Sequence, residues 1–224
     1  MYKRQEITGT ASELNTLLTA GNVTSEFSTD SFESLATATV SDSTLSVADL
    51  NGAISAANTA TSGTSTVFSL SAGATINTGD QSAFTTLLGY ETATQITISD
   101  QNITVDSGTI SVSNANLLDA TTTGTVTATI TSSSVDTLKT LTGTNAYTIT
   151  IASGDATGST AAELTAIDNA TTVAVDVSAI TSIEGTYEEI TALYGSSGVS
   201  GFGDESITIT CLLYTSPSPR DDVI

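Results

Sequence analysis

The chain has 224 residues, of which 24 are acidic, four are basic and none is histidine, giving a net charge of −20. This charge excludes nucleic acid and anionic membrane surfaces as partners, because both are bound through clusters of Lys and Arg. A single Cys and no His also exclude a Ser–His–Asp triad, a Cys–His pair and a disulfide scaffold.

The first predicted elements are two helices, each introduced by a capping box. In this pattern a Ser or Thr side chain accepts a hydrogen bond from the amide three residues on, and an acid there bonds back. The two segments are Thr10–Glu13 followed by Leu14 and Leu17, and Ser46–Asp49 followed by Leu50 and Ile54. Apolar residues three or four apart share one helix face, so we expect them to be buried and the acids to be exposed.

The middle of the chain alternates predicted strands with weaker helix starts. Period-two alternation of β-branched residues predicts strands at 67–70, 96–99, 103–105 and 126–130. The helix starts keep the cap and the apolar residues but lack the acid, and they are Asp80–Phe84–Leu87, Ser113–Leu117 and Ser134–Leu138–Leu141. Three short strands follow one another closely within 95–113, which is compatible with a local antiparallel meander.

The last third repeats the pattern of the first. Strands are predicted at 149–151, 173–177 and 207–209. Capping boxes return at Thr160–Glu163 followed by Leu164 and Ile167, and at Thr186–Glu189 followed by Ile190 and Leu193. The same helix carries Tyr187 and Tyr194 on one face, which we expect to pack between units rather than to form a sugar-binding platform.

The spacing of the helix starts indicates a repeat of variable length. The caps at 10, 46, 80, 113, 134, 160 and 186 lie 36, 34, 33, 21, 26 and 26 residues apart, within the range of solenoids. The octets 7–14 and 183–190 are the closest internal pair, and Gly9, Gly143 and Gly185 are predicted at tight turns from strand to helix.

These elements predict a β-rich α/β solenoid, in which short parallel strands alternate with short capped helices in tandem repeats. Helices of about one to three turns are unstable alone, so each unit has to bury its apolar face on its neighbours. Residues 6–210 are predicted to form about seven irregular units of 21–36 residues. The alternative is a string of small β-sandwich domains, whose strands would pair mainly antiparallel.

The two ends of the chain depart from this pattern. Residues 211–221, CLLYTSPSPRD, resemble the translation of a sequencing-library adaptor, and residues 1–5, MYKRQ, resemble the matching adaptor. Residues 6–210 contain no Cys, Pro, Met, Arg, His or Trp, and Lys139 is their one base. We therefore expect 1–5 and 211–224 to be adaptor-derived and to pack against nothing, and 6–210 to belong to a longer protein.

Residues 161–210 resemble the repeats of giant, adhesin-like surface or secreted proteins of marine bacteria and cyanobacteria. The similarity is best over 134–210. It implies an extracellular or cell-surface location and a role in adhesion, surface-layer assembly or motility, and it brings no catalytic residues with it. The expected function is a structural or adhesive repeat segment that acts as a spacer or stalk, and the chain is expected not to be an enzyme.

Carboxylates are the remaining groups that could carry chemistry. Glu188 with Glu189, and Asp204 with Glu205, are adjacent acids of the kind that glycosidases use. The alternative function is therefore a secreted, carbohydrate-active β-helix protein working through carboxylates. Acids are common at helix starts for electrostatic reasons, however, so no catalytic, cofactor-binding or metal-binding residue is predicted.

Calcium is the cofactor best suited to such a chain, because it needs only oxygen ligands. The candidate ligands are Asp100, Asp106, Asp155, Asp204 and Glu205. None lies in an EF-hand loop, so we expect weak calcium binding and no defined site. The expected partners are neighbouring repeats of the same chain and extracellular polysaccharide, with no nucleic acid and no membrane insertion.

Overall fold

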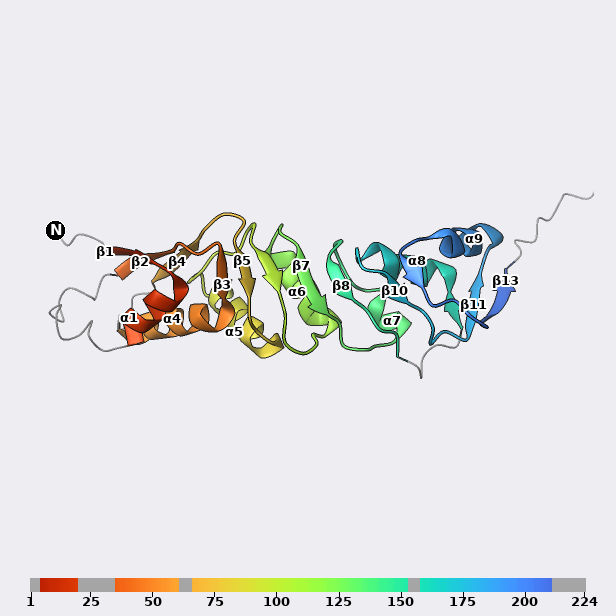
Figure 1. Cartoon of the computed structure of the whole chain (residues 1–224), viewed down its shortest axis with the longest axis horizontal. Coiled ribbons are helices and arrows are strands. Elements are labelled where there is room, and N and C mark those ends of the chain that lie inside the picture. The colour runs from red at the N-terminus through yellow and green to blue at the C-terminus, as the bar shows by residue number, and fades with distance from the viewer. Residues whose placement is uncertain (1–4, 20–34, 61–65, 153–157, 211–224) are drawn as a thin grey trace, which may run out of the picture.

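The computed structural model describes residues 5–19, 35–60, 66–152 and 158–210. Over these residues the chain is an α/β protein, with seven short helices and strands that pair in parallel. The elements follow one another in chain order along a single long axis, so the molecule is elongated, with β1 near one end and β13 near the other (Figure 1).

The helices are short and lie between strands throughout. They are α1 (Ala11–Thr19), α4 (Val47–Ala60), α5 (Gln81–Thr92), α6 (Val112–Thr121), α7 (Val135–Leu138), α8 (Ala161–Asn169) and α9 (Tyr187–Gly195). None of the helices in the described ranges is long and apolar enough to cross a membrane.

The strands have two to six residues each. They are β1 (Gln5–Gly9), β2 (Leu35–Val40), β3 (Thr44–Ser46), β4 (Val67–Leu70), β5 (Thr75–Asn77), β6 (Asn102–Thr104), β7 (Val126–Thr129), β8 (Ala146–Thr148), β9 (Ser159–Thr160), β10 (Val175–Asp176), β11 (Ser182–Gly185), β12 (Val199–Ser200) and β13 (Ser206–Ile209).

The strands form four parallel sheets. Their orders are β1-β2-β4, β3-β5-β6-β7-β8, β10-β12 and β13-β11-β9. Paired strands are separated in sequence by a helix or a long connection. In the five-stranded sheet, for example, Ile103 lies opposite Val126, and Thr127 lies opposite Ala146. Such connections bring the chain back in the same direction, which explains the parallel pairing.

The parallel pairing tests the antiparallel arrangements that the sequence left open. The β-sandwich alternative, which requires antiparallel pairs, does not fit the described residues. The antiparallel meander within 95–113 is also wrong, because Ile96 bridges to Phe68 in parallel and β6 lies between β5 and β7. Of the stretches predicted to be parallel neighbours, 149–151 and 173–177 meet through the parallel bridge of Thr150 to Asp176, whereas 126–130 pairs in parallel with 146–148 (β8) rather than with 149–151.

The core is one continuous layer of mostly aliphatic side chains that runs from Ala11 to Val199. Its strand side follows the predicted period-two alternation. In β7, for example, Val126 and Ala128 are buried, whereas Thr127 and Thr129 are exposed. Alternation of this kind places one face of each strand in the core and the other in solvent.

Six of the seven predicted helix starts are confirmed. In α8 the Thr160 hydroxyl accepts from the Glu163 amide at 3.2 Å, and the Glu163 carboxylate accepts from the Thr160 amide at 3.0 Å. The predicted cap Ser113 is wrong, because Ser111 accepts from the Asn114 amide and begins α6. The two-residue shift turns Leu117 outward, with 53% exposure, and places Leu118 in the core.

Strand predictions were less accurate. Residues 67–70, 103–105, 126–130 and 207–209 overlap strands closely, whereas 96–99 contains a single bridge, 149–151 follows β8, and 173–177 shortens to β10. The sequence patterns missed β1, β2, β3, β5, β8, β9, β11 and β12. Gly9 and Gly185 end strands before helix caps as predicted, but Gly143 follows α7, where its φ is 73°.

The predicted burial holds for Leu14, Leu50, Leu164 and Leu193, each 2% exposed or less. It fails for Leu17, which is 44% exposed, and Ile190 is only partly buried. The capping acids Glu13 and Glu189 are exposed, while Asp49 and Glu163 are half-buried. The expectation that residues 1–5 pack against nothing is wrong at Gln5, which begins β1 and pairs with Leu35 of β2. Residues 1–4 and 211–224 lie outside the described residues, so the rest of the prediction for the ends stays a prediction.

Candidate interaction surfaces

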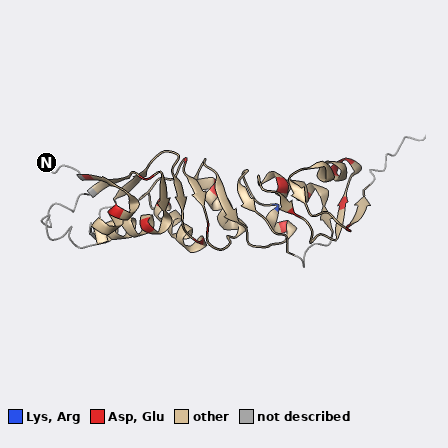
Figure 2. Cartoon of the chain, viewed as in Figure 1, with Lys and Arg blue, Asp and Glu red and all other residues tan. Residues whose placement is uncertain are grey.

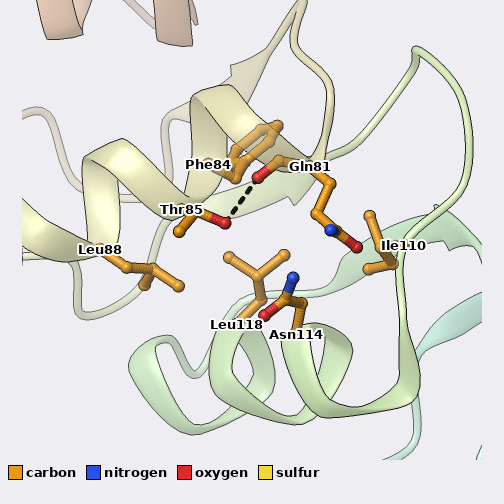
Figure 3. Close-up of a pocket in the computed structure, with 7 residues that line it drawn as sticks. All are labelled: Gln81, Phe84, Thr85, Leu88, Ile110, Asn114 and Leu118. Carbon is orange, nitrogen blue, oxygen red and sulfur yellow. Dashed lines mark hydrogen bonds between the residues drawn. The ribbon is translucent and has the colours of Figure 1, made fainter.

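Neighbouring helices contact one another through opposite sides, as α5 and α6 show (Figure 3). The residues of α5 that face α6 are Gln81, Phe84, Thr85 and Leu88, which lie one, four, five and eight residues after the cap Asp80. The residues that meet them are Ile110, Asn114 and Leu118, which lie one before and three and seven after the cap Ser111. The crevice between them is too narrow to hold a ligand.

We call these two sides forward and backward. The forward side comprises positions one, four, five and eight after the cap, and in α5 it faces α6, which follows in sequence. The backward side comprises the residue before the cap and positions three and seven after it, and in α6 it faces the preceding α5. The residue before the cap also lies against position one of the preceding helix at Gly79 with Val47 and at Gly185 with Ala161. Position four is 2% exposed or less in α1 and α4 to α8, and position seven is 9% exposed or less from α4 to α9.

The two ends of the molecule each expose one of these sides. In α1 the forward residues Ala11 and Leu14 are buried, but the backward residue Leu17 is 44% exposed. In α9 the reverse holds: Leu193 on the backward side is 1% exposed, whereas Tyr187 on the forward side is 69% exposed. The burial of a position therefore depends on whether a neighbouring helix covers it.

The aromatic residues of α9 belong to this exposed forward side. Tyr194 is 42% exposed and its ring stacks on Phe202, with centroids 4.2 Å apart. Its hydroxyl donates to the Glu205 carboxylate, and burial raises the Tyr194 pKa to about 12. The prediction that Tyr187 and Tyr194 pack between units is therefore wrong for the described residues.

Asparagine side chains of two helices form hydrogen bonds to the backbone at or just after the next helix in sequence. Asn51 of α4 donates to the Ala83 carbonyl in α5 at 2.9 Å. Asn116 of α6 donates to the Thr140 carbonyl at 2.8 Å and accepts from the Thr142 amide at 3.0 Å. The two groups that Asn116 binds follow the last residue of α7, where backbone groups have no partner within a helix. The Ala83 carbonyl lies in the first turn of α5, so Asn51 gives it a bond in addition to that of the helix.

A second set of polar bonds lies in the interior, just after the helices. Asn145 accepts from the Val126 amide at 2.8 Å and donates to the Asp119 carboxylate at 2.8 Å. Thr171 accepts from the Tyr147 amide and donates to its carbonyl. Because buried polar groups are costly unless paired, these bonds favour one strand register over its neighbours. Sequence reasoning missed both residues.

Lys139 is the one Lys or Arg within the described residues, and it bridges two segments. Its ammonium lies 2.5 Å from Asp136 and 2.7 Å from Glu163, the capping acid of α8. Hydrogen bonds to Asp136 and then to Glu163 raise the Lys139 pKa. The bond to Lys139, followed by that from the Thr160 backbone, lowers the Glu163 pKa.

Several candidate carboxylates accept hydrogen bonds from backbone amides or side chains. Glu189 closes the capping box of α9, and Glu205 accepts from Tyr194 and from the Gly203 amide. Asp106 accepts from the amides of Thr78 and Gly79 at 3.0 Å each.

The remaining candidates form no centre either. Glu188 and Asp204 are exposed, Asp100 accepts from Gln101, and Asp155 lies outside the described residues. Across the described parts of the chain, no three acidic, His or Cys side chains gather as a metal site would require. Acidic residues are instead spread singly along the whole length of the molecule (Figure 2).

Comparisons with protein-family models, with curated proteins and with solved structures gave no match.

Proposed function

We propose that residues 6–210 form a β-rich solenoid of about seven irregular units, and that this solenoid is a spacer or adhesive stalk of a secreted or cell-surface protein rather than an enzyme. The observation that carries the proposal is the contact of the forward side of one helix with the backward side of the next. An interface of this kind repeats by translation, so each unit added to either end would make the same contact with its neighbour.

The contacts between units explain how such a body would transmit load. Parallel strands tie each unit to its neighbours, for instance Ile76 to Ile103 and Ile103 to Val126, and the apolar layer beneath them is continuous. The bonds of Asn145 and Thr171 fix the register at the corners. A rod held in this way resists bending without disulfides, which residues 6–210 cannot form.

The surface supports an extracellular location. Ser and Thr occupy 77 positions of the whole chain, and the single charges are nearly all negative. In a medium rich in cations, screening over about 8–10 Å removes most of the repulsion between such charges. The engagement of carboxylates in helix caps supports a structural role over a catalytic one. Neighbouring repeats are the primary partners, and extracellular polysaccharide is the expected target of an adhesive stalk.

Small-angle X-ray scattering of the full chain in dilute, low-salt solution tests the proposal. A globular chain of this length has a radius of gyration of about 17 Å and an unfolded one about 51 Å. We expect an intermediate value and the profile of a rod of uniform cross-section. A value near that of a globule, or the profile of beads on a flexible string, would contradict the stacked architecture.

A further inference from the structure

We propose that the outer face of the five-stranded sheet β3-β5-β6-β7-β8 binds ice, through rows of threonine side chains that hold water in an ordered array. This sheet lies in the middle of the molecule, between the two ends of the chain (Figure 1). The proposal goes beyond the spacer, and it needs only the parallel pairing of these five strands.

The outward residues of this sheet lie in rows that cross the strands. The inward residues, such as Ile76 and Ile103, are buried, so the residues on either side of them in each strand point outward. Three rows of outward residues lie opposite one another: Thr44, Thr75 and Asn102; Thr104, Thr127 and Ala146; and Thr129 and Thr148. All of these side chains except that of Ala146 carry a hydroxyl or an amide.

The threonine hydroxyls of these rows are free to bond outward. Within the described ranges, no protein group bonds the hydroxyls of Thr44, Thr75, Thr104, Thr127, Thr129 and Thr148. Threonines on the helices differ, because their hydroxyls donate to the backbone one turn earlier. Thr86 donates to the Ser82 carbonyl at 3.1 Å, and Thr165 donates to the Ala161 carbonyl at 2.9 Å. The sheet is therefore where threonine hydroxyls gather without a protein partner.

The same face carries no charge, although the chain has a net charge of −20. None of the five strands contains an acidic or basic residue, whereas other strands place acids outward, namely Glu6 in β1, Asp176 in β10 and Glu184 in β11. A charged group orients water around itself and would disturb a neutral lattice. The strands also present no exposed aromatic ring and no pocket, the usual features of a small-ligand site. The face therefore suits ordered water better than an ion or a sugar.

The spacing of the rows supplies the order. Neighbouring strands lie about 4.8 Å apart, and alternate residues of one strand about 6.6 Å apart, so the hydroxyls form a grid whose spacings are comparable to repeat distances of ice. Threonine is branched at Cβ and keeps few rotamers, and its hydroxyl both donates and accepts. Waters held by such a grid are already partly ordered, which lowers the entropy that they lose on joining ice. Each contact is weak, so the grid acts only as a whole.

An ice recrystallisation assay of the full chain tests the proposal. We expect the wild type to keep ice grains small and to give single ice crystals flat facets. Thr127→Lys places a long, hydrated charge between Thr104 and Ala146, and it should raise the concentration needed at least about tenfold, because the remaining contacts no longer act together. Thr86→Lys is the matched control, since it makes the same change at an exposed helix position, and it should act like the wild type.

Thr129→Lys, at an exposed position of the third row, is a second variant in case Thr127→Lys fails to fold, and urea unfolding shows which variants are folded. A wild type that leaves ice growth unchanged would overturn the proposal, as would full activity in the folded row variants or an equal loss in Thr86→Lys. Sedimentation of the wild type with cellulose powder, abolished by Thr127→Lys and without an effect on ice, would show that the face binds a sugar instead. None of these outcomes alters the scattering profile, so they leave the spacer untouched.

Discussion

The free energy of unfolding lost when an apolar side chain is truncated should depend on whether a neighbouring helix covers that side chain, and not only on its position in its own helix. Leu164 and Ile190 occupy the same position, four residues after the caps of α8 and α9. Leu164 is 1% exposed because α9 follows α8, whereas Ile190 is only partly buried. Leu164→Ala and Ile190→Ala therefore form a matched pair, and Glu163→Ala tests the neighbouring cap.

The expected losses differ in size. Leu164→Ala removes buried carbons and leaves a cavity between α8 and its neighbours, which costs about 2–5 kcal/mol. Ile190→Ala removes carbons that are already partly in water, so at about 0.8 kcal/mol for each fully buried methylene the loss should be about 1 kcal/mol. Glu163→Ala loses a capping bond and a partly exposed ion pair with Lys139, together about 1 kcal/mol.

Urea unfolding followed by circular dichroism measures these losses as shifts in midpoint, provided that the slope is unchanged. Equal losses for Leu164→Ala and Ile190→Ala would show that the missing neighbour does not matter. Equal losses for Leu164→Ala and Glu163→Ala would show that the assignment of buried and exposed helix faces is wrong.

Three further predictions concern charge and the polar interior. In the folded state Lys139 and the Thr160 amide lower the Glu163 pKa. The charged Glu163 therefore contributes fully to the free energy of unfolding at pH values above the ordinary pKa of Glu, and this contribution is lost as the pH falls through the lowered pKa. Urea midpoints from about pH 7 to about pH 3 should therefore show the advantage of wild type over Glu163→Gln disappearing in that acid window. Added cations should raise the melting temperature, and concentrated sodium should reproduce the effect of millimolar calcium; a large shift with micromolar calcium alone would reveal a dedicated site. Asn145→Ala should cost about 1–3 kcal/mol in urea unfolding because the Val126 amide loses its buried partner, while Asn169→Ala at an exposed position should be nearly neutral.

Helix starts could be predicted from the sequence because their determinants are local. A capping box needs only a hydroxyl and an acid three residues apart, and Thr10, Thr160 and Thr186 all show it. The one error, Ser113 in place of Ser111, arose where Ser residues stand two apart and no acid follows either. Local chemistry then leaves the choice to packing, which turned Leu118 rather than Leu117 inward.

Burial at the ends could not be predicted, because it depends on neighbours and not on the residue. Leu17 and Leu193 have the same position in their helices, yet only Leu193 has a preceding helix against it. The buried polar residues were hidden for a different reason. With Ser and Thr at 77 positions, nothing local distinguishes Thr171 in the interior from the exposed Thr172 beside it.

The way the acids are used explains how residues 6–210 fold with one base. Carboxylates that accept from backbone amides include those of Glu13, Asp42, Asp80, Asp106, Glu163, Asp176, Glu189 and Glu205. Most of these amides are at helix starts, where unpaired N–H groups and the helix dipole favour a negative charge. Each of these acids is thus stabilised by amides of its own segment or of a neighbouring one. This stabilisation needs no Lys or Arg, so in the proposed solenoid each further unit would add negative charge without adding an unpaired buried charge, and cations of the medium would screen the total charge.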